Sequence, residues 1–397
     1  MRSDASVIGL ISFAHGMSHF YQLLLAPLFP FIRNELEVSY AALGLLVALF
    51  YALSGLLQPL AGFVVDRYGA RSVLLGGVGC FVASAVLMGF SSTYGMLALG
   101  AALGGIGNSV FHPADFTILN ARVSPPRLGY AFSAHGVVGY LGYAVAPVFS
   151  VSIAAAFGWQ AALLAGAGLG VGLLVLLLAN SRHLQVEARA PAAKRASFSE
   201  DARVLLAWPV VLCFLYFTVF AAGLAGLQTF SVSAMVEQYR VAATVASGAL
   251  TAYLVAAAAG ILAGGFVAAR VARHDLVAAA GLAVNAAAIL LVAMSQVPGA
   301  ALPAMFAIAG FASGMVAPSR DLIVRASTPP GATGRVFGFV YSGLDVGSFA
   351  TPVFYGWMLD HHLPQAVFYT AFAFTALALL TILLVPERNA PAVEKAQ

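Results

Sequence analysis

The chain has 397 residues, of which 61% are hydrophobic and 9% are charged, and its formal net charge is +4. A soluble protein of this length needs many more charged side chains to cover its surface. The composition therefore excludes a soluble globular protein and predicts one with many membrane-spanning segments.

Twelve apolar stretches are each long enough to cross a bilayer as a helix, which takes about 20 residues. Strands are not expected, because no alternation with a period of two residues recurs along the chain. The sequence thus predicts an all-α membrane protein. In chain order, the expected helices cover residues 7–32, 40–62, 72–91, 94–121, 129–156, 159–180, 206–231, 243–268, 275–296, 299–325, 334–358 and 365–385.

Basic side chains predict the orientation of these helices. If the N-terminus is cytoplasmic, every lysine and arginine except Arg33 and Arg240 falls at a cytoplasmic loop or helix end. Such an excess of basic residues marks the cytoplasmic side of membrane proteins. We expect a multi-pass inner-membrane protein with both termini in the cytoplasm, and no nucleic-acid partner. Cys80 and Cys213 lie inside apolar stretches, so no disulfide framework is expected.

One long polar connection divides the chain into two sets of six helices. We expect an N-terminal six-helix bundle at residues 1–180, a cytoplasmic linker at 181–205 and a C-terminal six-helix bundle at 206–397 that ends in a short cytoplasmic tail. An offset of 205 residues aligns glycines and prolines of the two halves, which indicates an internal duplication. The aligned pairs are Pro113 with Pro318, Gly129 with Gly334, Gly142 with Gly347, and Pro147 with Pro352.

A short charged loop follows the second stretch, with Gly62, Asp66, Arg67, Gly69 and Arg71 within ten residues. This loop resembles the signature of the major facilitator superfamily of transporters. The resemblance implies two pseudo-symmetric six-helix bundles that act as a monomer. It also implies that the acid and the bases of the loop tie helix ends together in one access state.

Two further motifs resemble particular branches of this superfamily. The segment from Gly142 to Pro147 is similar to the glycine-proline signature on the fifth helix of the antiporter branch. The segments 56–59 and 109–113 resemble the fosmidomycin-resistance branch of drug exporters, as do His15, Gln22 and Pro30. The fourth helix lacks the arginine common in drug/proton antiporters, and its acid, at position 115, comes one residue late. Resistance to fosmidomycin itself is therefore not predicted.

Ionisable side chains inside a membrane are costly unless paired or hydrated, so they are candidates for function. On the first helix, His15, His19 and Gln22 have the spacing i, i+4, i+7 and share one face. Imidazoles titrate near physiological pH, so this stripe can carry protons or bind a substrate. The alternative is a pair of histidines packed against neighbouring helices. The helix carries no acid or cysteine in reach, so no metal and no cofactor are expected.

The fourth helix repeats this spacing with Asn108, His112 and Asp115. Pro113 lacks a backbone N–H and is expected to bend the helix. Asp115 either exchanges a proton with His112 or pairs with an arginine near the cytoplasmic end. We assign His15, His19, His112 and Asp115 to proton coupling.

Asp345 is the sharpest candidate in the second half. It lies near mid-bilayer on the eleventh helix without a basic neighbour in sequence. Burial there disfavours the charged carboxylate, which suits proton uptake and release. Arg320 lies opposite Asp115 in the repeat, and it either pairs with that acid as a cytoplasmic gate or snorkels to the interface.

The remaining polar and aromatic side chains at mid-helix depth are assigned to a substrate cavity or to helix packing. The cavity set is Gln22, Asn108, His135, Tyr140, Tyr143, Tyr216, Gln228, Tyr253, Arg320 and Tyr341. Packing or bending is assigned to Gly142, Pro147, Pro113 and Pro318.

No catalytic constellation or phosphate-binding loop appears, so neither an enzyme nor an ATP-driven pump is expected. The function predicted is proton-coupled export of a small organic solute by alternating access. Two alternatives remain open: a proton symporter that imports a small organic anion or metabolite, and a membrane-embedded sensor without flux.

Overall fold

The computed structural model describes residues 2–186, 204–329 and 333–385, and every regular element within them is a helix. This confirms the all-α prediction. Most of the expected linker and the tail after residue 385 lie outside the described residues.

The first half forms six crossings, of which the first and the fourth are each built from more than one helix. Its elements are α1 (Arg2–Leu24), η1 (Ala26–Leu28), α2 (Phe29–Leu36), α3 (Tyr40–Tyr68), α4 (Ala70–Gly89), α5 (Tyr94–Asn108), α6 (Phe111–Arg122), η2 (Pro125–Arg127), α7 (Leu128–Phe157), α8 (Trp159–Ala179) and η3 (Ser181–Leu184).

The second half also forms six crossings, and its fifth, the eleventh of the chain, is divided at Thr351. Its elements are α10 (Trp208–Tyr239), α11 (Ala243–Ala268), α12 (His274–Ala293), η4 (Gly299–Ala301), α13 (Leu302–Ala326), α14 (Thr333–Ala350), α15 (Pro352–Asp360) and α16 (Pro364–Leu383). The twelve expected crossings are confirmed. Ten of them, in the described part of the chain, are long and apolar enough to span a membrane by length and composition alone. The first and the eleventh are the exceptions.

Local chemistry fixes several helix ends. The side chains of Ser39 and Thr93 accept hydrogen bonds from the first turns of α3 and α5, as N-caps do. Gly69 ends α3 at φ 83° and Gly158 ends α7 at φ 88°, where a residue with a Cβ is disfavoured. The signature loop therefore depends on Gly69 for its turn.

The largest boundary error concerns the seventh crossing, expected to end at residue 231. Helix α10 continues to Tyr239, because its polar last turn is bonded to α12. Gln238 Nε2 and Tyr239 Oη donate to the carbonyl of Val292 at 2.9 and 2.6 Å. Hydropathy alone does not register such anchoring.

The aligned prolines have opposite effects in the two halves. The fourth crossing breaks between α5 and α6 just before Pro113, whereas Pro318 lies inside the unbroken α13. Conversely, Pro147 lies inside the unbroken α7, whereas Pro352 begins α15 after a break. The bend expected at Pro113 is thus an interruption of the helix at residues 109–110, where the backbone stays in the right-handed helical region.

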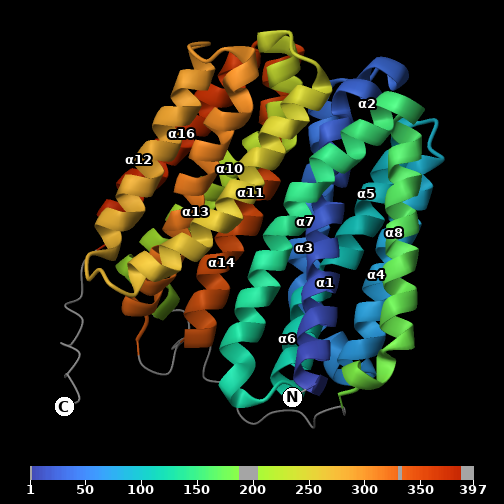
Figure 1. Ribbon diagram of the computed structural model, residues 1–397, viewed down its shortest axis with the longest axis vertical. Helices are drawn as coiled ribbons and strands as arrows, with labels where there is room; N and C mark the ends of the chain where they lie inside the picture. Colours follow the sequence, from blue (N-terminus) through green and yellow to red (C-terminus); the bar gives the residue numbers. More distant parts are fainter. Residues whose placement is uncertain (1, 187–203, 330–332, 386–397) are drawn as a thin grey trace.

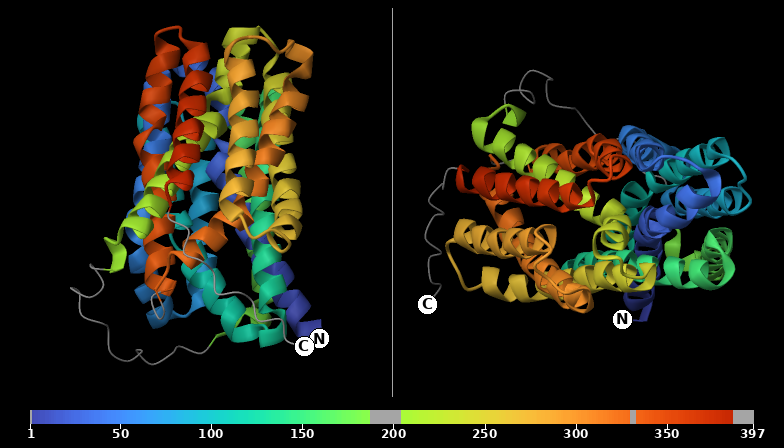
Figure 2. Two further views of the ribbon diagram at one scale, coloured as in Figure 1. Left: turned by 90° about the vertical axis from the view of Figure 1, so that its left-hand side faces the viewer. Right: turned by 90° about the horizontal axis from the view of Figure 1, so that it is seen from above.

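Figure 1 shows the two halves side by side, with the first half in blue to green and the second in yellow to red. Figure 2, seen from above, shows the same separation. Helix α1 begins at the lower end in Figure 1, which we call the near end, and α2 lies at the opposite, far end.

The internal duplication is visible in how helices pack. Gly105 of α5 lies against the carbonyl group of Phe50, and Gly310 of α13 lies against the carbonyl group of Tyr253. The glycines are 205 residues apart and their partners 203. Likewise, Gly142 of α7 faces the backbone of Gly16, and Gly347 faces that of Thr218. Equivalent helices therefore approach each other backbone to backbone in both halves, which small residues permit in membranes.

The halves are joined at the far end. Both carboxylate oxygens of Asp360, at the end of α15, accept hydrogen bonds from the first backbone N–H groups of α3: 2.7 Å from Tyr40 and 2.9 Å from Ala41. Free N–H groups and the helix dipole both favour a carboxylate at this place. Phe29 of the first half also meets Phe230 of the second, with ring centroids 5.6 Å apart.

We expect Gly142→Ala to destabilise the fold. The new methyl group would collide with the Gly16 carbonyl and force α1 and α7 apart, and overpacking of this kind costs about 1–3 kcal/mol. Thermal unfolding of the purified protein in detergent measures the loss as a lower melting temperature. Gly136→Ala, on the same helix but facing open space, is the control and should leave the melting temperature unchanged or higher. Equal loss in both variants would contradict this account of the packing.

Candidate functional site

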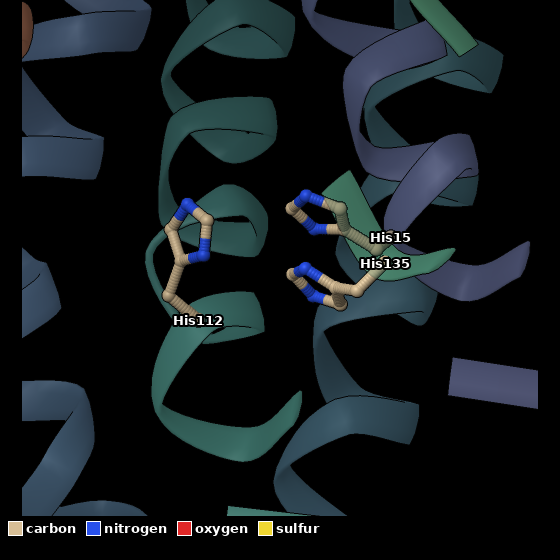
Figure 3. A group of neighbouring side chains, drawn as sticks. All are labelled: His15, His112 and His135. Carbon is tan, nitrogen blue, oxygen red and sulfur yellow. The ribbon is translucent and has the colours of Figure 1, made fainter. Parts of the chain in front are cut away.

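Three histidines from three helices of the first half meet in the interior. His15 comes from α1, His112 from α6 and His135 from α7, and Figure 3 shows His112 facing the other two rings. The rings of His15 and His135 stack with centroids 3.5 Å apart, and the ring of His112 lies 5.2 Å from that of His15. The stripes expected on the first and fourth helices thus face each other, and His135 completes the group.

Asp115 lies inside this group and is fully buried. Its Oδ2 atom is 3.1 Å from Nε2 of His135 and 3.6 Å from Nδ1 of His15. The alternative in which Asp115 pairs with an arginine near the helix end is not seen, since Arg127 pairs with Asp4 instead. The buried acid is therefore a member of the histidine cluster.

Several polar atoms of the cluster have no hydrogen-bond partner among the described residues. They are Nδ1 of His15, His19 and His112 and Oδ1 of Asp115. Buried polar atoms are normally satisfied, so such a concentration indicates that the site takes up a proton, a water molecule or a ligand.

Ring contacts and then hydrogen bonds connect the cluster to further polar side chains toward the middle of the molecule. The ring of His19 lies 4.4 Å from that of His15 and 4.2 Å from that of Tyr143. The Tyr143 hydroxyl donates to Gln22 Oε1 at 2.5 Å, and Gln22 Nε2 donates to Asn108 Oδ1 at 3.0 Å. The two predicted stripes are thereby linked into one polar column.

Helix α3 contributes two side chains to this column that sequence reasoning missed. Ser54 accepts a hydrogen bond from Asn108 Nδ2 at 2.7 Å, and Tyr51 donates to Gln22 Oε1 at 3.4 Å. A serine and a tyrosine in an apolar helix carry no charge, so they gave no signal in the sequence. The one sign available in the sequence was their i, i+3 spacing, which puts both side chains on a common face of the helix.

Asp345 reaches the column from the second half. A Cβ atom placed on Gly55 of α3 would lie 3.3 Å from the Asp345 Cβ atom, and the carboxylate is within electrostatic range of Tyr51 and Tyr143. Within the described residues, no hydrogen bond or ion pair satisfies this carboxylate. Asp345 is therefore an unpaired acid at the boundary between the halves.

A second polar cluster lies in the second half. Asp321 accepts hydrogen bonds from Arg320 Nε at 2.9 Å and from the Tyr341 hydroxyl at 2.8 Å. The Arg320 guanidinium also covers the ring of Phe217 at 4.5 Å. The expected gate pair between Arg320 and Asp115 is not formed in this conformation. Tyr140 of the first half lies within electrostatic range of Arg320.

Three residues of the expected cavity set are buried within the second half. Tyr216 is 0% exposed, Tyr253 3% and Gln228 9%. Asn285 Nδ2 donates to the Tyr253 hydroxyl at 3.3 Å, which ties α11 to α12. These side chains pack helices together in this conformation, whereas Tyr140, Tyr143, Arg320 and Tyr341 remain partly exposed.

The charged side chains of the loop at the near end form no salt bridge with another described residue. The described residues provide no salt bridge to Asp66, Arg67 or Arg71, and Gly62 faces open space. Arg67 lies over its neighbour Tyr68, 5.4 Å from the ring centroid. The two ends therefore differ among the described residues: hydrogen bonds join the halves at the far end, and no salt bridge joins them at the near end.

Comparison with known proteins agrees with this architecture. Among curated proteins, the fosmidomycin resistance protein of Escherichia coli (strain K12) is 27% identical over 403 residues, which cover 98% of this chain and 95% of that protein. Multidrug resistance protein 1 of Bacillus subtilis (strain 168) is 36% identical over 117 residues, 28% of this chain and 30% of that protein.

Solved structures share the fold. A bacterial homologue of the human lysosomal transporter Spinster, inward-facing and unoccupied, superimposes with a TM-score of 0.76 at 18% identity and covers 98% of this chain and 99% of its own. A variant of the nucleoside transporter NupG gives a TM-score of 0.80 at 13% identity, with 96% and 100% covered.

The sequence profile of the Major Facilitator Superfamily matches residues 9–235 and again 218–397, so it covers nearly the whole chain in two halves. The resemblance inferred from the loop and helix motifs is thus confirmed. The chain belongs to the major facilitator superfamily of membrane transporters.

Proposed function

We propose that the protein exports a small organic solute in exchange for protons, by alternating access of a site between its halves. The observation that carries this proposal is Asp345, an unpaired acid that meets the polar column of the first half at mid-helix depth. An acid in this place is costly when charged, so loading and release of a proton can be coupled to movement of the halves.

The proton path in this proposal runs from Asp345 into the first half. Tyr143, His19 and His15 connect the boundary to Asp115 through ring contacts and through the 3.6 Å approach of His15 Nδ1 to Asp115 Oδ2. His112 faces the same cluster from α6. The solute would lie between the halves, against Tyr140 and Tyr143 on one side and Arg320 and Tyr341 on the other.

The near and far ends of the molecule differ in their contacts between the halves, and this difference supports alternating access. The Asp360 contact to α3 closes the far end, and no salt bridge between described residues joins the halves at the near end. We place the near end in the cytoplasm of a cell with an inner membrane, in line with the basic residues. In the opposite state, the loop would pair and the Asp360 contact would open.

Two observations bear on the direction of transport. The curated relatives described above are named as resistance proteins, which favours export. The partly exposed Arg320 instead suits an anionic solute, and it keeps proton symport of a small organic anion as the second candidate. In both candidates the protein acts as a monomer.

The sign of the proton movement separates the two candidates. Purified protein is reconstituted into sealed liposomes with a weakly buffered, pH-sensitive dye outside, and fosmidomycin or ethidium is added outside. Exchange releases protons and acidifies the outer solution, whereas symport makes it alkaline. If both compounds and a panel of small carboxylates move without any proton signal, the coupling proposed here is wrong.

We expect Asp345→Asn to abolish the proton signal while the fold is retained. The amide cannot carry a proton, so solute and proton movement become uncoupled. Asp275→Asn is the control, because Asp275 is an acid of the same half that pairs locally with Arg273 at 2.8 Å. A full proton signal from the Asp345→Asn variant would remove this acid from the mechanism.

We expect Asp360→Asn to open the far end. Loss of the charge removes about 1–2 kcal/mol from a contact to two backbone N–H groups, or roughly a 5- to 30-fold change in the equilibrium between states. The readout is maleimide labelling of Ser233→Cys, a buried position beside Tyr40, in a protein without Cys80 and Cys213. Labelling should become faster by roughly this factor.

The control for this experiment is Glu35→Gln. Glu35 bonds Trp159 and Gln160 within the first half, so its loss does not touch the contact between the halves. Equal labelling rates in the Asp360→Asn variant and the parent would show that this carboxylate does not hold the far end closed.

A further inference from the structure

The histidine cluster also has the composition of a metal site. One nitrogen from each of His15, His112 and His135 lies within 4.8 Å of the others. Figure 3 shows the His112 ring on one side and the stacked rings of His15 and His135 on the other. The ligands come from α1, α6 and α7, so no single helix carries the pattern.

The distances are close to what a tetrahedral ion requires. With Zn–N bonds of 2.0–2.1 Å, neighbouring ligand nitrogens lie about 3.4 Å apart. The nitrogens of the cluster therefore need to approach by about 1.4 Å at most, which rotation of the side chains supplies.

A carboxylate completes the ligand set. Asp115 is 0% exposed, His15 3% and His135 4%, and Oδ2 of Asp115 lies beside the nitrogens of both histidines. Carboxylates next to ligating histidines either bind the ion or orient the ring, and both raise affinity. His112 is only partly buried and gives the ion a route to the other ligands.

Buried polar atoms of the cluster also support a metal site. Nδ1 of His15, Nδ1 of His112 and Oδ1 of Asp115 are buried, and no described residue forms a hydrogen bond with them. Three neutral imidazoles and one carboxylate suit zinc and related divalent transition ions rather than magnesium or calcium, which prefer oxygen ligands.

We propose that His15, His112, His135 and Asp115 bind one divalent transition-metal ion of the zinc class inside the first half. Bound there, the ion joins α1, α6 and α7. This inference concerns residues that also belong to the proposed proton path, but it does not depend on transport.

The test uses the full chain, purified in detergent with an affinity tag that contains no histidine. Cobalt(II) serves as a spectroscopic probe, because tetrahedral nitrogen and oxygen ligation gives intense visible absorption, and zinc titration by calorimetry gives the stoichiometry. We expect one ion per chain, displacement of cobalt by zinc, and a higher melting temperature with zinc.

Substitution of single histidines identifies the residues that bind the ion. His112→Gln and His135→Gln should each weaken zinc binding by more than about 10-fold, since loss of even an outer-shell partner costs this much. The control is the double variant His361→Gln, His362→Gln, which removes two exposed neighbouring histidines and should leave the cobalt spectrum unchanged.

Three results would overturn the proposal: no binding to the parent protein, an octahedral cobalt spectrum, or unchanged affinity in both cluster variants. The circular dichroism spectrum and melting temperature of each variant without metal show that it has folded. Failure of proton-coupled flux in liposomes, by contrast, would refute the proposed function and leave metal binding intact.

Discussion

A polar group inside a membrane must find its partners within the protein, and this constraint organises the whole structure. The first half meets it with one continuous column, from Asp115 through the histidines to Tyr143, Gln22 and Asn108. The second half meets it with a compact cluster around Arg320 and Asp321. Asp345 stands between them, and no described residue forms a hydrogen bond or ion pair with its carboxylate, so a proton bound there can respond to movement of the halves.

Close backbone packing holds the helices of each half together. Gly105 and Gly142 bring helices of the first half into direct backbone contact, and Gly310 and Gly347 do the same in the second. The glycines of these contacts recur at an offset of 205 residues. The duplicated halves therefore share this packing, whereas their polar residues differ. The halves themselves are joined at the far end by the Asp360 contact to the start of α3 and by the close approach of Gly44 and Gly356 to the opposite backbone.

Much of the fold could be predicted from the sequence, because hydropathy reports burial in lipid directly. The expected eighth helix, 243–268, coincides with α11. The polar end of α10 escaped prediction, since its anchoring depends on α12. For the site, helical spacing placed His15 and His19 on one face, but it did not reveal that His135 and Asp115 converge on them from other helices. Metal binding was not expected for the same reason: its ligands are assembled only by tertiary structure.

The central claim is that the halves move against each other, opening one end as the other closes. Spin labels placed in pairs on exposed positions measure this directly, with Tyr68 and Arg270 at the near end and Asn34 and His361 at the far end, in a protein whose two cysteines have been replaced. Electron–electron double resonance in lipid nanodiscs, at neutral and acidic pH, gives both distance distributions. The account predicts that whenever one distance lengthens the other shortens. Distances that change together, or that stay fixed in a preparation shown to transport, would contradict it.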